Sequence, residues 1–252
     1  MSADRGDGGR DGDATAELAA TVATACRVLG RRGLVDGVLG HVSARLPGGG
    51  YLVRCRGPHE RGVARTAAED VRRVGADDRL AEPAAGWQLP KELPIHAALY
   101  RARPEVGAVV HAHPPAALRC GLAGLEPRPV FGAYNIPALR MAVDGVPVYP
   151  RPVLISRPEL AEEMVAAMGD RPLCLLRGHG ITVTGPTVEA ATVAAVNLED
   201  LLSVTLDLAL LGVEPPALGP DDLAELPDLG TAFNDELAWR ALVAELRDVA
   251  GS

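Results

Sequence analysis

Two histidines at the end of an apolar stretch are the first residues of this chain whose types and spacing could do chemistry. His111 and His113 stand two residues apart in VGAVVHAH, a continuous apolar run that predicts a buried strand. The period-two geometry of a strand puts both imidazoles on one face, roughly 6–7 Å apart at Cβ, where the rings can converge on one ion. The alternative is a pair of hydrogen-bonded polar residues at a strand end.

A third histidine and a glutamate extend this candidate site. His179 lies between two glycines directly after the apolar stretch LCLLR, so the backbone can approach closely and the ring is left exposed at a strand end. Three neutral imidazoles with an open fourth position form the usual catalytic pattern for a borderline cation such as zinc. Glu92 opens the helix predicted before the H-x-H strand, at the positive end of its dipole. This carboxylate is a candidate ligand or base, and the alternative is a group that only caps the helix.

The elements that must position these side chains alternate between helix and strand, which predicts a single α/β domain. Apolar periodicity predicts helices over about residues 15–32, 92–103 and 187–211, a hairpin made of HVSARL and YLVRCR, and two short strands in RPLCLLRGHGITVTG. Residues 1–14 hold mainly Gly, Asp and Arg and predict a disordered tail before a domain spanning residues 15–252. Thr66, with Glu69 three residues later, predicts the capping box of a further helix.

Composition restricts the class of partner. The chain has 252 residues, 48% of them apolar, which is enough for one sizeable core. Its net charge of −8 argues against nucleic acid, whose binders need a basic face. The four cysteines are widely spaced, as buried thiols in a reducing compartment are. Without an apolar leader or a run of about 18 apolar residues, we expect a cytoplasmic protein that has no membrane partner.

Three segments, in order along the chain, resemble the class II aldolase/adducin family. KELPIHAALYRARPEVGAVVHAHPPAA is similar to its signature, in which a Glu, a Pro and a His precede a helix, an R-P pair and a strand ending in H-x-H. GHVSARLPGG resembles its Gly-x-x-Ser turn, and LLRGHGITVTG before a long helix resembles its third-histidine segment. The resemblance covers about residues 15–215. It implies a three-layer α/β/α sandwich around a mostly antiparallel sheet, assembled as a homotetramer with active sites at the subunit interfaces.

The resemblance also implies a role for each residue of the candidate site. His111, His113 and His179 would hold a divalent ion, usually Zn²⁺, with Mn²⁺, Co²⁺ or Fe²⁺ as alternatives. Glu92 would be the general acid/base, moving the proton of a carbanion that the ion stabilises.

The predicted substrate is a small carboxylate rather than a sugar phosphate. Sugar-phosphate members of the family hold the phosphate with a Gly-Asn turn and a Ser-Ser pair just before the acidic residue. Here the turn reads Gly-His and the pair reads Pro-Lys, so the small donors that fit a phosphate are absent. Cationic groups instead suit a carboxylate or phenolate. The candidate substrate-binding residues are His41, Ser43, Lys91 and Arg54.

The predicted function is a metal-dependent carbon–carbon lyase, of the branch that resembles decarboxylases of hydroxylated aromatic acids such as 3,4-dihydroxyphthalate. The alternatives are a metal-dependent aldolase of a hydroxy-carbonyl or sugar-phosphate substrate, a metal-dependent oxygenase, and a non-catalytic adducin-like interaction protein. A Schiff-base aldolase would need a desolvated lysine, and Lys91 is the only lysine in the chain. Tyr134 and Tyr149 are candidates for the family's catalytic tyrosine or are ordinary packed residues. His96, one helical turn after Glu92, is either a hydrogen-bond partner of that carboxylate or of a ligand, or it is structural.

Overall fold

A seven-stranded sheet forms the centre of the molecule in the computed structural model, which describes residues 7–82, 85–216 and 218–247. The strands run in the spatial order β3-β2-β1-β4-β7-β6-β5, and every neighbouring pair is antiparallel except β5 and β6. Their bounds are β1 His41–Arg45, β2 Tyr51–Arg54, β3 Val71–Val74, β4 Ala108–Ala112, β5 Val148–Tyr149, β6 Leu173–Leu176 and β7 Gly180–Gly185. The mostly antiparallel sheet predicted above is confirmed.

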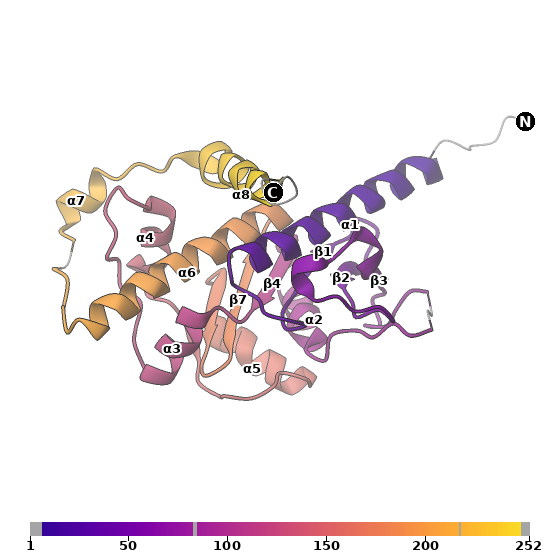
Figure 1. Cartoon of the computed structure of the whole chain (residues 1–252), viewed down its shortest axis with the longest axis horizontal. Coiled ribbons are helices and arrows are strands. Elements are labelled where there is room, and N and C mark those ends of the chain that lie inside the picture. The colour runs from indigo at the N-terminus through magenta and orange to yellow at the C-terminus, as the bar shows by residue number, and fades with distance from the viewer. Residues whose placement is uncertain (1–6, 83–84, 217, 248–252) are drawn as a thin grey trace, which may run out of the picture.

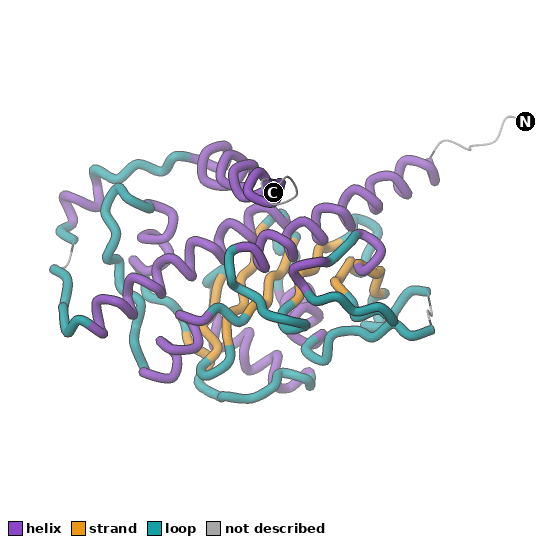
Figure 2. Tube along the Cα trace, in the orientation of Figure 1, coloured by secondary structure: helices purple, strands orange, loops and turns teal. Residues whose placement is uncertain are grey.

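Helices cover both faces of this sheet and complete the sandwich (Figure 1). Helices α1 and α6 lie along one face, and α2 and α5 lie against the other. The strands are therefore enclosed between two helical layers, as the trace in Figure 2 shows. The α-helices are α1 Asp7–Arg31, α2 Leu93–Ala102, α3 Pro115–Ala123, α4 Ile136–Val143, α5 Pro158–Met168, α6 Val188–Leu210, α7 Pro220–Ala224 and α8 Ala238–Arg247. The other helical segments are the 3₁₀ turns η1 Val63–Arg65 and η2 Ala68–Asp70 and the π-helix η3 Ala232–Leu237.

Two apolar clusters, one on each face, form the core. Because side chains alternate along a strand, Val42 and Ala44 of β1 join α1 and α6 in one cluster. Val53 of β2 and Val109 of β4 join α2 and α5 in the other. Val109 lies opposite Ser43 across the β1–β4 ladder, so the face towards α2 also receives the polar residues of β1. This face carries the candidate site.

The sequence predictions differ from the structure at two places outside the sheet. Helix α1 begins at Asp7, eight residues before the predicted start, so residues 7–14 are helical; residues 1–6 lie outside the described part of the chain. The capping box at Thr66 is wrong, because the Thr66 hydroxyl donates to Val63 O at 2.7 Å and so closes η1 instead. The division into a tail and one domain stays a prediction. Within the described residues, no helix combines the length and apolar character needed to cross a membrane.

Candidate metal centre

Strand β4 brings two of the histidines to the centre of the sheet. His111 is fully buried and lies between His41 of β1 and Thr182 of β7 across the two ladders. His113 follows the end of β4, and its backbone N–H donates to Leu34 O at 3.0 Å, which holds the chain extended past the last strand residue. The predicted period-two arrangement is therefore present, with both rings on the face of the sheet towards α2.

The turn between β6 and β7 brings in the third histidine. Gly178 has a φ of +64°, a left-handed conformation that favours glycine, and it turns the chain directly before His179. At Gly180, an added Cβ would overlap the carbonyl oxygen of Ala112 and crowd the ring of His113. Only glycine permits this close approach of β7 to β4, which places His179 beside His113.

Glu92 reaches the same point from the start of α2. It occupies the N-cap position of this helix, but its side chain makes no capping hydrogen bond. Its Oε1 instead accepts a hydrogen bond from the backbone N–H of Ile155 at 3.2 Å, in the loop between β5 and α5. The helix-capping interpretation of Glu92 is therefore wrong. The orienting contribution of Ile155 is a backbone contact across 63 residues that no local sequence signal reveals.

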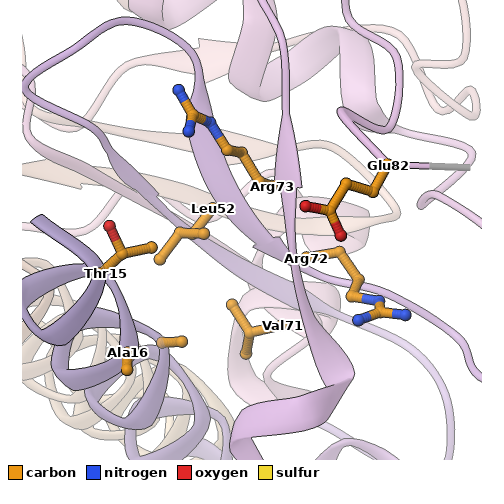
Figure 3. Close-up of a pocket in the computed structure, with 9 residues that line it drawn as sticks. Thr15, Ala16, Leu52, Val71, Arg72, Arg73 and Glu82 are labelled. Atoms are coloured by element: carbon orange, nitrogen blue, oxygen red, sulfur yellow. The ribbon is translucent and has the colours of Figure 1, made fainter. Parts of the chain in front are cut away.

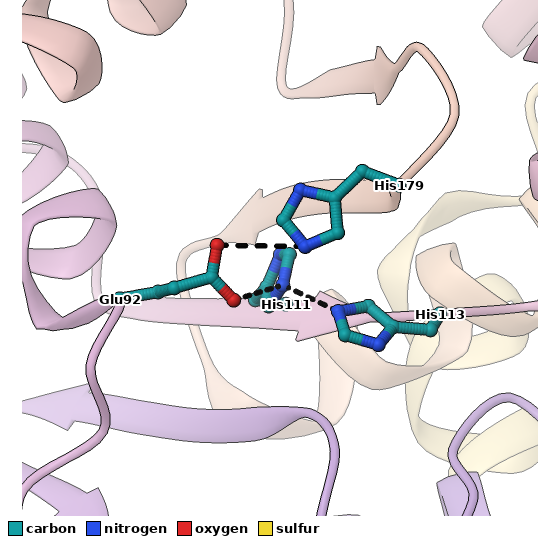
Figure 4. A group of neighbouring side chains, drawn as sticks. All are labelled: Glu92, His111, His113 and His179. Carbon is teal, nitrogen blue, oxygen red and sulfur yellow. Dashed lines mark hydrogen bonds and ion pairs between the residues drawn. The ribbon is translucent and has the colours of Figure 1, made fainter. Parts of the chain in front are cut away.

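These four side chains converge on one point (Figure 4). The Nε2 atoms of His111 and His113 lie 2.9 Å apart. Glu92 Oε2 lies 3.2 Å from His111 Nε2, and Glu92 Oε1 lies 3.4 Å from His179 Nε2. One donor atom from each of the four residues falls within a set whose members are all within 4.8 Å of one another.

The donor set fits a divalent ion. Two imidazole nitrogens bound to one tetrahedral zinc, each at about 2.1 Å, would be roughly 3.4 Å apart, close to the separations between donor atoms in this cluster. The Nδ1 atoms of His111 and His179 are buried without a hydrogen-bond partner among the described residues. Three imidazoles and a carboxylate whose donor atoms lie within 4.8 Å of one another form a donor set for a borderline cation.

Electrostatics favour the metal-binding protonation states of Glu92 and His113. Burial raises the pKa of Glu92, but hydrogen bonds and charge interactions with His111 and His179 outweigh it, so the net pKa lies below the usual range and the carboxylate is ionised. Burial lowers the pKa of His113 to about 3, with repulsion from His111 and His179 acting in the same direction. A neutral imidazole and an ionised carboxylate are the forms that bind a metal.

The group formed by Glu92, His111, His113 and His179 is called the metal cluster below. Behind it lies a chain of buried polar side chains. His41 Nδ1 lies 2.6 Å from His96 Nε2, and His96 Nδ1 lies 2.6 Å from Ser43 Oγ. Ser43 Oγ lies 2.7 Å from the hydroxyl of Tyr100. His96 therefore contacts His41 and Ser43, and of the alternatives given for it the hydrogen bond to Glu92 is not found among the described residues. The sequence analysis missed Tyr100, although its place four residues after His96 on α2 puts the two on one helix face.

The remaining substrate-binding candidates have different positions. Arg54 is 3% exposed and projects to the opposite face of the sheet, since its neighbour Val53 faces α2, and it forms an ion pair with Glu60. The structure therefore does not bring Arg54 to the cluster. Lys91 is exposed next to Glu92 in the sequence, which removes the desolvation that a Schiff-base lysine needs.

Neither candidate tyrosine joins the four-residue cluster. Tyr134 is 84% exposed and packs edge-on against Phe131. Tyr149 is buried, and its hydroxyl donates to Glu163 Oε2 at 3.0 Å, which ties it to helix α5. No tyrosine in the described residues is recorded in contact with Glu92 or with the three histidines around it.

A separate surface pocket of about 440 Å³ lies between α1 and the β2–β3 edge of the sheet (Figure 3). Its labelled residues are Thr15 and Ala16 of α1, Leu52 of β2, Val71, Arg72 and Arg73 of β3, and Glu82. None of the four cluster residues lines it. We assign it no role in the chemistry of the cluster.

The fold and the cluster together define an α/β/α sandwich that carries a candidate divalent-metal site at the C-terminal end of its central strand, β4. The chain belongs to the family of the class II aldolase and adducin N-terminal domain, whose model matches residues 20–206. It is 50% identical to the 3,4-dihydroxyphthalate decarboxylase of Arthrobacter keyseri, over 89% of this chain and 92% of the relative. It is 49% identical to the enzyme of the same name from a Terrabacter species, over 89% and 95%. A solved structure of L-fuculose 1-phosphate aldolase from Glaciozyma antarctica shares the fold, with a TM-score of 0.74, 18% identity and coverage of 93% and 92%. The predicted family and fold are confirmed.

Proposed function

We propose that this chain is a divalent-metal-dependent decarboxylase of a hydroxylated aromatic dicarboxylate, with 3,4-dihydroxyphthalate as its substrate. The observation that carries the proposal is the convergence of Glu92 with three imidazoles on one point, in a chain about half identical to two relatives of that name. The absence of the Gly-Asn turn and the Ser-Ser pair, with His41 and Lys91 in their place, further supports a carboxylate over a sugar phosphate.

In this proposal His111, His113 and His179 hold the ion, for which zinc is favoured and Mn²⁺, Co²⁺ or Fe²⁺ are alternatives. When bound, the ion would supply Lewis-acid stabilisation of negative charge on the hydroxyl and carboxylate oxygens of the acid. The imidazoles contribute by their fixed placement, because β4 and the glycine turn leave their Nε2 atoms facing one another. Lys91, exposed beside Glu92, is proposed to attract the anionic substrate.

Glu92 is proposed to move the proton. As an ionised carboxylate it takes the proton of a substrate hydroxyl. The bond between the ring carbon and the neighbouring carboxylate then breaks, carbon dioxide leaves, and the electron pair of that bond stays on the ring carbon. Glu92 returns its proton to this carbon, and a proton from solvent water restores the substrate hydroxyl, so the product from 3,4-dihydroxyphthalate is 3,4-dihydroxybenzoate. The Ile155 backbone N–H holds Oε1 in place, so Glu92 stays beside the metal cluster throughout.

The test is an assay of the metal-loaded protein. Separate preparations loaded with each of the four ions are incubated with 3,4-dihydroxyphthalate, and carbon dioxide and 3,4-dihydroxybenzoate are measured. We expect both products in equal amounts, and no products after chelation of the ion. Cleavage of L-fuculose 1-phosphate without loss of carbon dioxide would favour the aldolase alternative. Oxygen consumption by the Fe²⁺ form would favour the oxygenase alternative, and a protein that binds no metal would favour the non-catalytic one.

Matched variants separate the roles. Glu92→Gln should retain the ion and lower kcat by about 10²- to 10⁴-fold, the usual contribution of a positioned acid/base group. His113→Ala should lose stoichiometric metal. His59→Ala is the control, because His59 lies exposed in a loop and outside the cluster. Equal metal content in His113→Ala and His59→Ala, with both variants folded by circular dichroism, would contradict the assignment.

We also propose that the chain assembles as a homotetramer. Leu210 and Leu211, at the end of α6, are 76% and 75% exposed, and Val213 beyond them is 50% exposed. Neighbouring apolar side chains exposed to this degree are typical of an interaction surface. Light scattering of the purified protein gives the mass that tests this assembly. The cytoplasmic location stays a prediction.

A further inference from the structure

The buried chain of side chains behind the metal cluster fixes where its protons lie. Four side chains, two from helix α2 and two from strand β1, are hydrogen-bonded one to the next. They are, in order, the hydroxyl of Tyr100, Ser43 Oγ, the two ring nitrogens of His96, and His41 Nδ1. Ser43 and His96 are fully buried, His41 is 5% exposed and Tyr100 is 8% exposed. Each link in such a chain needs one donor and one acceptor, so the direction of one link sets the others.

Only one direction uses every proton. If Tyr100 donates to Ser43, then Ser43 donates to His96 Nδ1, and the proton on His96 Nε2 is donated to His41 Nδ1. In the reverse direction Nδ1 of His96 donates to Ser43, and the hydroxyls of Ser43 and Tyr100 then hold two protons but have only one acceptor between them. No other acceptor for these hydroxyls is recorded among the described residues. A buried donor left without a partner is costly, so the first direction is favoured.

The protonation state of His96 agrees with this direction. Burial lowers the pKa of His96 to about 3, with repulsion from His111 acting in the same direction, so the ring is neutral and carries one proton. A neutral His96 that accepts from Ser43 at Nδ1 must carry its proton at Nε2. It therefore donates to His41, and Nδ1 of His41 is the acceptor.

We propose that this row of hydrogen bonds holds His41 as the Nε2–H tautomer, and that the Nε2–H group of His41 binds an anionic oxygen of the substrate. His41 lies directly opposite His111 in the β1–β4 ladder, with ring centroids 4.9 Å apart, so it lines the edge of the metal cluster. Because Nδ1 is occupied by His96, Nε2 is the ring nitrogen left for a ligand. Tyr100, Ser43 and His96 are positioning residues, and they make His41 a fixed neutral donor instead of a cation or a base. The ligand part of this proposal rests on the proposed function.

Neutron diffraction of the zinc-loaded protein after exchange into deuterium oxide reads the tautomer directly. We expect deuterium on Nε2 of both His41 and His96, and none on Nδ1 of either ring. Deuterium on Nδ1 of His41 would overturn the proposal. This measurement needs no substrate, so it decides the tautomer even where the decarboxylase function fails.

Ligand binding tests the second part of the proposal, that the N–H group of His41 binds the substrate. In a Glu92→Gln background, where turnover is suppressed, calorimetry measures the affinity for 3,4-dihydroxyphthalate. His41→Phe should weaken binding about ten- to a hundredfold, the usual effect of losing a hydrogen bond to a charged group. His41→Asn should remain within a fewfold of the parent, because its amide can accept from His96 and donate to the ligand. Equal affinities for His41→Phe and His41→Asn would overturn the assigned donor role. If the parent binds no dihydroxyphthalate, the proposed function fails and the ligand assigned to His41 fails with it.

The positioning residues are tested by kinetics of the otherwise unchanged enzyme. Ser43→Ala removes the hydroxyl that directs the proton on His96, so His41 is no longer held in one tautomer. Because this perturbs binding of the acid and leaves Glu92 in place, we expect KM to rise severalfold with a smaller change in kcat. Tyr100→Phe is the matched variant, since Ser43 can still donate to His96. The neutron diffraction map of this variant should still show deuterium on Nε2 of His41. An unchanged KM in Ser43→Ala would overturn the positioning role.

Discussion

Replacement of Glu199 by glutamine should remove a pH-dependent loss of stability near neutrality. Glu199 lies on α6, and its Oε1 accepts a hydrogen bond from the backbone N–H of Ala116 at 3.1 Å, at the start of α3. Its other oxygen is buried without a partner among the described residues. Burial raises the pKa of Glu199 from an ordinary 4.5 to about 7, although the backbone donors of α3 act against this.

The sign and size follow from linkage. Because the pKa of Glu199 is higher in the folded protein than in the unfolded chain, the folded state holds the proton more tightly between pH 4.5 and about 7. The free energy of unfolding should therefore fall as the pH rises through this window and level off above pH 8. A full shift of this size corresponds to about 3 kcal/mol, and partial solvent screening of the side chain reduces the expected loss to about 1–3 kcal/mol.

Urea unfolding of the wild type and Glu199→Gln at pH 5, 6, 7 and 8 measures this effect. The amide cannot ionise and still offers an oxygen to Ala116, so the stability of the variant relative to the wild type should rise by about 1–3 kcal/mol from pH 5 to pH 8. Glu162→Gln is the control, since Glu162 is exposed on α5 and should show a constant difference. A constant difference for Glu199→Gln as well would refute the reasoning.

Three further predictions concern the scaffold. Gly180→Ala should displace β7 from β4, because its Cβ would overlap Ala112 O; metal content should fall and the midpoint of thermal unfolding should decrease. Arg54→Leu should cost about 1.5–3 kcal/mol, the usual value of a hydrogen bond to a charged group, because it removes the partner of Glu60; urea unfolding measures this, while the KM of the folded fraction stays unchanged. All four cysteines are buried and free, so a thiol reagent should modify none of them in the native protein within minutes and all four in urea.

The sequence was sufficient to predict those parts of the fold and of the candidate site that a local residue pattern determines. The apolar run before His111 and His113 predicts a central strand, and period two then requires both rings on one face. The glycines around His179 predict a close backbone approach, which is the contact of Gly180 with β4. The order of these segments identifies the family, and the family implies the mostly antiparallel sheet. Each of these features is encoded in one short segment, and the family is encoded in the order of such segments along the chain.

The remaining features depend on contacts between distant segments. Helical spacing pairs His96 with Glu92, but Glu92 is a non-helical N-cap, with φ −97° and ψ 24°, and its side chain leaves the helix surface. The true partner of His96 is His41, 55 residues earlier in the chain. Arg54 has the charge expected of a substrate-binding residue, but the register of β2 against β1 turns it to the face opposite the cluster. Neither the register nor the long-range partner can be derived from residue types alone.

The hydrogen bonding of buried polar groups differs between the metal cluster and the row of side chains behind it. Tyr100, Ser43, His96 and His41 form a continuous chain in which each hydrogen-bonding link is made within the protein, and such a chain rigidifies a fold. The metal cluster beside it is arranged differently, since three of its donor pairs are 2.9–3.4 Å apart and all four donor atoms lie within 4.8 Å of one another. Protein groups alone satisfy this arrangement incompletely, because the Nδ1 atoms of His111 and His179 are left without a hydrogen-bond partner among the described residues. The hydrogen-bonded chain follows the rule that buried polar groups are paired within the protein, and the adjacent metal cluster departs from it. We infer that function, rather than stability, determined the residues of the metal cluster.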